Sequence, residues 1–132
     1  MFGSIVVADL LMNRILVVDD DIDILTVVGL ILNRHNFSVL AISRWEQLFD
    51  SIDTFFPDLI LLDVDLSGAD GCDICRQLKR SKKNSQIPII LFSASSRLAE
   101  DSTECMSNGF VSKPFDTPFL LKTIRLNIAK AS

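Results

Sequence analysis

Short runs of apolar residues alternate along the chain with segments whose apolar residues recur at helical spacing. The runs are apolar throughout, which is typical of parallel strands that are covered on both faces. Such strands are expected at residues 14–18, 37–41, 58–62, 87–92 and 110–112. Strands that alternate with helices in this way predict an α/β protein, a doubly wound parallel sheet with helices on both faces.

The same pattern predicts five helices. Ser43 and Glu46 form a capping box that would begin the second helix. Thr117 would cap the last helix, because it is followed by a proline at the first helical position. Apolar residues at helical spacing mark the helices near residues 24–32, 45–49, 74–78 and 120–128. A weaker fourth helix is expected at residues 97–107, ending near Asn108 and Gly109.

Composition narrows the possible classes of protein. The net charge is −4 and no basic cluster is present, so direct nucleic-acid binding is not expected. No apolar stretch is long enough to span a bilayer, so no membrane association is expected. Cys72 and Cys75 lack a second pair of metal ligands, and Cys105 has no evident partner. Three reduced, structural thiols in a cytoplasmic protein are therefore expected.

The length suits one domain, expected over residues 13–131. Residues 1–12 are interpreted as an N-terminal extension. They either precede a natural start at Met12 or pack as an extra segment, and the sequence leaves both open. The last helix is expected to end close to the end of the chain, which leaves no room for an output domain.

Carboxylates stand at the ends of two expected strands. Asp19 and Asp20 follow the first strand and Asp63 follows the third. The carboxyl ends of parallel strands meet at one edge, and acids gathered there repel one another unless a cation lies among them. The sequence therefore predicts a Mg²⁺ site, with Asp20 and Asp63 as direct ligands and Asp19 acting through water. The backbone carbonyl of Asp65 would supply a further ligand.

Two more polar residues follow expected strands at the same edge. Ser93 ends the fourth strand and Lys113 follows the fifth. Asp63 would be a nucleophile that forms an acyl phosphate. Lys113 would neutralise one phosphoryl oxygen and the Ser93 hydroxyl would hydrogen-bond another, since phosphoryl transfer depends mainly on positioning and charge neutralisation.

Four motifs, in this order and at these strand ends, resemble the receiver domain of two-component response regulators. The resemblance covers residues 13–130, and its motifs are residues 15–21, 61–71, 92–94 and 113–115. It implies a flavodoxin-like fold with strand order 2-1-3-4-5 and a phosphoaspartate at Asp63. It also implies a histidine kinase or histidine phosphotransfer protein as donor, and a cis peptide bond between Lys113 and Pro114.

The resemblance further implies a switch. Ser93 and Phe110 would change position on phosphorylation and remodel the helix 4–strand 5–helix 5 surface, which would bind a downstream partner or form a homodimer. Three residues depart from the family pattern. Ser67 stands where members often have proline, Phe110 replaces a common tyrosine, and Asp65 adds an acid. Asp65 is hypothesised to slow anionic phosphodonors or to alter autodephosphorylation.

Three alternatives remain open. Asp63 and Asp65 also resemble the Asp-x-Asp motif of haloacid-dehalogenase-type phosphatases, although in that family the nucleophile strand comes first. A receiver-like interaction module that is never phosphorylated would have the same fold, and the chain could be part of a longer hybrid kinase or regulator. The prediction is a phosphoacceptor that catalyses its own phosphorylation and dephosphorylation, not a multiple-turnover enzyme.

Overall fold

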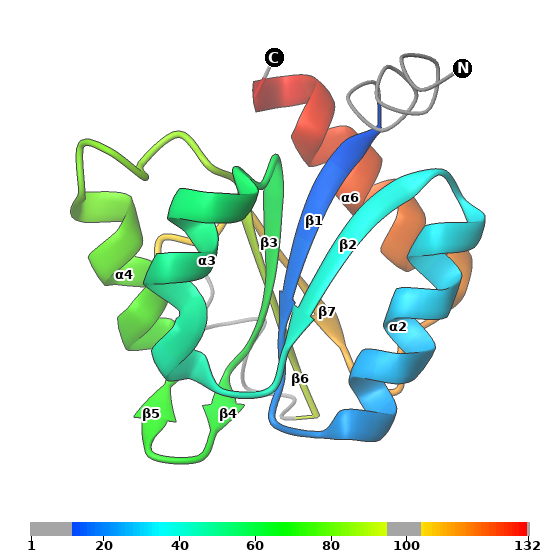
Figure 1. The fold of residues 1–132 in the computed structure, drawn as a ribbon, viewed down its shortest axis with the longest axis horizontal. Helices are drawn as coiled ribbons and strands as arrows, with labels where there is room; N and C mark the ends of the chain where they lie inside the picture. Colours follow the sequence, from blue (N-terminus) through cyan, green and yellow to red (C-terminus); the bar gives the residue numbers. More distant parts are fainter. Residues whose placement is uncertain (1–11, 95–103, 132) are drawn as a thin grey trace.

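The computed structural model describes residues 12–94 and 104–131. A five-stranded parallel sheet forms its centre, with strand order β2-β1-β3-β6-β7 (Figure 1). The strands are β1 (Asn13–Val18), β2 (Phe37–Ile42), β3 (Leu59–Asp63), β6 (Ile89–Ser93) and β7 (Gly109–Ser112). The helices are α2 (Ile22–Arg34), α3 (Leu48–Phe55), α4 (Gly71–Arg80) and α6 (Thr117–Ala131), with a 3₁₀ turn, η1, at Trp45–Gln47.

Both faces of the sheet are buried under helices. Helices α3 and α4 cover one face, and α2 and α6 cover the other (Figure 1). Alternate residues of β1 supply the two cores, with Leu16 and Val18 under α3 and α4, and Ile15 and Val17 under α2 and α6. This two-sided burial explains why the strands are continuous apolar runs in the sequence.

The predicted fold class and strand order are confirmed, and each strand begins and ends within two residues of its predicted bounds. One feature was not predicted. Strands β4 (Asp65–Leu66) and β5 (Ala69–Asp70) form a small antiparallel hairpin directly after β3. The described residues contain four α-helices. Most of the helix expected at 97–107 lies outside the described residues, and residues 104–106, at its expected end, form a turn.

Two predicted helix caps are wrong. No side-chain cap is formed at η1 or α3, because the chain enters α3 through a 3₁₀ turn and the Ser43–Glu46 capping box is not made. Helix α6 begins at Thr117 itself, and the carboxylate of Asp116 accepts a hydrogen bond from the Phe119 N–H at 3.0 Å. The cap therefore lies one residue earlier than predicted, where an aspartate is available.

The expectation of three reduced thiols is also wrong. Cys72, in the first turn of α4, forms a disulfide with Cys105, 33 positions later in the segment before β7. Two cysteines this far apart in sequence meet only because the fold packs these elements together. Cys75 is a buried free thiol whose pKa burial raises to about 11, which fits a structural role.

Within the described residues, the helices are all too short or too polar to cross a lipid bilayer.

Candidate functional site

The polar residues predicted to meet at one edge of the sheet do so. Asp63 is the last residue of β3 and Ser93 the last of β6. Asp19 and Lys113 are the first residues after β1 and β7. The parallel register of these strands brings all four positions to the same edge. The Lys113 N–H donates to the Ser93 carbonyl at 2.8 Å, which fixes the backbone of the lysine beside β6.

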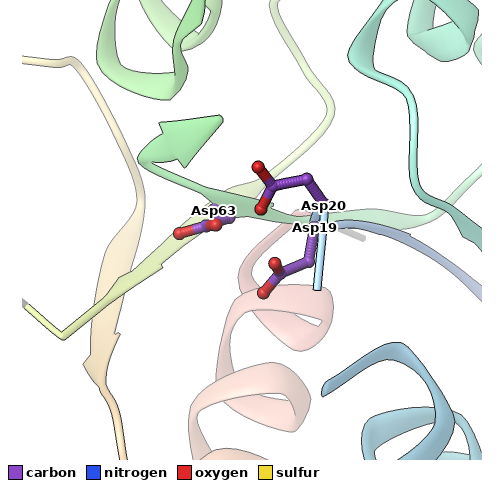
Figure 2. A group of neighbouring side chains, drawn as sticks. All are labelled: Asp19, Asp20 and Asp63. Atoms are coloured by element: carbon purple, nitrogen blue, oxygen red, sulfur yellow. The ribbon is translucent and has the colours of Figure 1, made fainter. Parts of the chain in front are cut away.

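Three carboxylates form a cluster at this edge. Asp19, Asp20 and Asp63 each place an oxygen within 4.8 Å of the others, and Figure 2 shows them gathered at the ends of β1 and β3. Asp19 and Asp63 are buried, whereas Asp20 is exposed. Such a cluster could bind a metal ion, because it supplies oxygen ligands on a partly open surface.

Among the residues that the structure describes, Lys113 is the cation that faces this cluster. Its Nζ lies 2.7 Å from Asp19 Oδ2 and 3.5 Å from Asp63 Oδ1. Burial opposes the charge on Lys113, but the two aspartates outweigh burial and raise the pKa of the lysine. The peptide bond between Lys113 and Pro114 is cis, as predicted.

The Asp63 carboxylate is strongly perturbed by its surroundings. Burial and the negative charge of Asp19 raise its pKa from 3.8 to about 7, although Lys113 and the Asp65 N–H act in the opposite direction. One lysine therefore does not neutralise the three carboxylates. A divalent cation beside Asp20 and Asp63 would reduce this repulsion, so the residues present fit a metal site.

Ser93 and Asp65 are linked across the site. The buried Ser93 hydroxyl donates to Asp65 Oδ2 at 3.1 Å, and the Asp65 N–H donates to Asp63 Oδ1 at 3.2 Å. Asp65 thus contacts both the expected nucleophile and the expected switch residue. Whether its backbone carbonyl is a metal ligand stays a prediction. Phe110, the other expected switch residue, is half-buried on β7 and packs against the core under α3 and α4.

Gly71 and Ser67 both affect the geometry of the site, and sequence reasoning missed both contacts. Asp70 caps the start of α4, where its carboxylate accepts a hydrogen bond from the Cys72 N–H at 2.8 Å, and Gly71 is the first residue of the helix. A Cβ on Gly71 would lie 2.1 Å from the Asp63 carbonyl oxygen, so the helix packs directly against the backbone of Asp63. An aspartate and a glycine just before a helical apolar stripe could have indicated this cap.

The second missed residue is Ser67. Its N–H and its hydroxyl both donate to Asp20 Oδ2, at 3.1 Å and 2.8 Å. No local signal could have found this contact, because the two residues are 47 positions apart.

Comparisons with known proteins identify the family of the chain. The family model of the response regulator receiver domain matches residues 15–125. The chain belongs to this family. The receiver is 30% identical over 124 residues to the "DNA-binding response regulator MtrA" of Mycolicibacterium smegmatis, which covers 92% of the chain and 53% of that protein. It is 34% identical over 105 residues to the regulatory protein PhoP of Bacillus subtilis, which covers 78% of the chain and 43% of PhoP.

The receiver therefore spans about half the length of these curated relatives. Among solved structures, a putative response regulator from Chloroflexus aurantiacus superposes with a TM-score of 0.83 at 24% identity, over 89% of this chain and 98% of that one. A CheY-like receiver domain from Methanospirillum hungatei superposes with a TM-score of 0.81 at 23% identity, over 91% and 96% of the two chains. At this identity the two structures support the shared fold alone.

Proposed function

We propose that this receiver accepts a phosphoryl group on Asp63 from a histidine kinase or a histidine phosphotransfer protein. The observation that carries the proposal is the position of Asp63, a buried carboxylate at the end of a central strand, between an acid pair and Lys113. Membership of the receiver family supports a histidine kinase or phosphotransfer protein as the proposed phosphoryl donor.

In the proposed reaction, an Asp63 carboxylate oxygen attacks phosphorus and forms an acyl phosphate, while the bond from phosphorus to the donor's imidazole nitrogen breaks. Lys113 Nζ, 3.5 Å from Asp63, is close enough to neutralise a phosphoryl oxygen without a large movement. The Ser93 hydroxyl would stabilise another oxygen. Hydrolysis of the acyl phosphate by water would return the carboxylate.

Mg²⁺ is the proposed cofactor. Asp20 and Asp63 would bind it directly, Asp19 would act through water, and the Asp65 carbonyl would complete the protein ligands. When bound, the ion would neutralise part of the negative charge on the transferred phosphoryl group. The hydrogen bonds of Asp19 suit an indirect role, because its two oxygens already accept Lys113 Nζ at 2.7 Å and the Asp21 N–H at 2.9 Å.

The proposed output is a change in the helix 4–strand 5–helix 5 face, to which β7 and α6 contribute among the described residues. To reach the phosphoryl group, the Ser93 hydroxyl would have to leave Asp65, and Phe110 would move with it. To turn the switched conformation from rare to dominant, phosphorylation must stabilise it by roughly 5 kcal/mol relative to the resting conformation. Phe119 and Leu126 on α6 are about half exposed and offer apolar contacts for a downstream partner or a homodimer.

We propose that the receiver acts stoichiometrically in the cytoplasm, with one phosphoryl group per chain. The proposed location rests on the receiver family and not on the cysteines, two of which form a disulfide. The proposed domain spans residues 13–131, with residues 1–12 as an extension. The haloacid-dehalogenase alternative is disfavoured by the receiver family match and by the acid pair directly after β1, which precedes Asp63 in the chain. A module that is never phosphorylated is disfavoured because Asp63, Lys113 and Ser93 all lie at the same edge.

The direct test is incubation with acetyl phosphate, with Mg²⁺ or with EDTA, followed by intact-protein mass measurement. One added phosphoryl group is expected only with Mg²⁺. Borohydride reduction followed by peptide mass measurement would then locate the acyl phosphate at position 63. Continuous hydrolysis of a generic phosphomonoester would favour the phosphatase. Absence of uptake from both acetyl phosphate and a panel of phosphorylated histidine kinases would contradict the proposal.

Asp65→Asn is expected to speed uptake from acetyl phosphate about two- to fivefold, because it removes a charge that repels the anionic donor by ~0.5–1 kcal/mol. Asparagine keeps an oxygen that can accept the Ser93 hydroxyl, so the hydrogen bond at 3.1 Å can persist. Initial rates at several salt concentrations would measure the effect, which should shrink as salt rises. Asp53→Asn, which makes the same charge change at an aspartate paired with Lys83, is the control. Equal rates for Asp65→Asn and the control would contradict the repulsion.

A further inference from the structure

Asp20 is the exposed member of the carboxylate cluster, and its position needs an explanation. It lies in the loop between β1 and α2, beside the buried carboxylates of Asp19 and Asp63. Like charges repel, and a solvent-exposed aspartate is free to rotate toward water. Nevertheless, an Asp20 oxygen stays within 4.8 Å of oxygens of both neighbours. Some attractive contact must therefore hold it there.

Ser67 supplies that contact. Its hydroxyl at 2.8 Å and its N–H at 3.1 Å both donate to Oδ2 of Asp20. Hydrogen bonds to an ionised acceptor are stronger than those between neutral groups. Both donors meet the same oxygen, and a carboxylate has a second oxygen through which it can bind a cation.

The serine itself is held by the small hairpin. Asp65 pairs with Asp70 and Leu66 with Ala69, so Ser67 and Gly68 form the two-residue tip. Gly68 has a φ of +81°, a conformation that favours glycine. Leu66 is buried and anchors the hairpin to the core. The donors of Ser67 are thus carried on an ordered element and not on a free loop.

We propose that Ser67 is a positioning residue for the metal site: it holds the Asp20 carboxylate beside Asp19 and Asp63 before the cation binds. The inference rests on the proposed function, since it assumes that the cluster binds Mg²⁺. Mg²⁺ binds oxygens at 2.0–2.1 Å, so two of its ligands lie at most about 4.2 Å apart. A cluster already within 4.8 Å needs only a small movement to close on the ion.

Loss of the serine hydroxyl should therefore weaken Mg²⁺ binding. Partners that orient a metal ligand commonly change affinity by 10–100-fold. Ser67 and Asp20 are exposed and one N–H donor would remain, so we expect about a three- to tenfold loss for Ser67→Ala. At saturating Mg²⁺ the rate of phosphoryl uptake should return to that of the wild type, because only the ligand's position is affected.

The chain carries its own reporter of binding. Trp45 is the only tryptophan, and it lines a small hollow of about 180 Å³ together with Asp20 and Ser67. Mg²⁺ titrations followed by Trp45 fluorescence, and repeated by calorimetry, would give the affinity without measuring phosphorylation. The test variants are Ser67→Ala and Ser67→Thr, of which the second keeps a hydroxyl. Ser38→Ala is the control, because Ser38 lies on β2 and pairs with Arg14 at the opposite end of the sheet.

We expect Ser67→Ala to bind Mg²⁺ more weakly than the wild type. Ser67→Thr and Ser38→Ala should bind it with nearly the wild-type affinity. Unchanged affinity in Ser67→Ala would overturn the inference, and tighter binding would show that Ser67 competes with the ion. Failure of Ser67→Thr to restore affinity would also overturn it. If the wild type itself binds no Mg²⁺ by either method, the proposed function fails instead, so the two failures can be told apart.

Discussion

Asp63→Asn is expected to abolish phosphoryl uptake and to make the metal-free fold more stable. Uptake is lost because the amide cannot form the acyl phosphate. Stability rises because burial and Asp19 penalise the charge on Asp63, as its raised pKa of about 7 indicates. The folded protein binds this proton more tightly than the unfolded chain, so the penalty is absent below pH 3.8, grows as pH rises, and is complete above about pH 7.

The stability gain of Asp63→Asn should follow the same pH course. We expect almost no difference from wild type near pH 4 and on the order of 4 kcal/mol above pH 7 in EDTA. Urea unfolding across this pH range would measure the difference. Mg²⁺ should reduce it by stabilising the wild type. Asp58→Asn is a control, because Asp58 accepts the Arg14 N–H at the opposite edge of the sheet. A variant that loses stability at neutral pH would contradict the charge repulsion described here.

Gly71→Ala is expected to destabilise the fold by about 3 kcal/mol or more. The added methyl group would lie 2.1 Å from the Asp63 carbonyl oxygen and 2.8 Å from the Val64 Cα, and neither backbone atom can rotate away. Helix α4 would have to move from the end of β3 and would move Asp63 with it. Because small displacements in a phosphoryl-transfer site are costly, uptake from acetyl phosphate should fall at least about tenfold in the fraction that remains folded.

Gly29 provides the matched control. It lies on α2, and a Cβ there would meet nothing within 4 Å. Gly29→Ala should therefore gain up to about 1 kcal/mol from helix propensity, with unchanged phosphoryl uptake. Urea unfolding and initial uptake rates of both variants test the comparison. If Gly71→Ala lost less than about 1 kcal/mol, the close approach of α4 to Asp63 would be wrong.

Much of the site was predictable from local sequence. Each parallel strand is a continuous apolar run because both its faces are buried, and Asp19, Asp63 and Lys113 follow such runs directly. Parallel strands end at one edge, so strand position alone indicated which polar residues would meet. The helix caps were less predictable. Asp116 and not Thr117 caps α6, because which of several adjacent polar residues caps a helix depends on where packing makes that helix start.

Contacts between distant segments were not predictable. The disulfide between Cys72 and Cys105 and the hydrogen bonds from Ser67 to Asp20 each join residues more than thirty positions apart. No periodicity or local motif encodes such pairs. The sequence also did not reveal the hydrogen-bond partners of residues that it identified as important. The contact between the Ser93 hydroxyl and Asp65 is an example.

The sequence by itself determined the α/β class, the strand order through its family motifs, and the set of acids, serine and lysine at one edge. Periodic burial and strand-end position are local properties, so they can be read along the chain. Only the tertiary structure decided which of these charges lie within a few ångströms of one another, how close α4 comes to Asp63, and that a hairpin tip carries Ser67 to Asp20. Those features depend on distances of a few ångströms between elements, which packing alone sets.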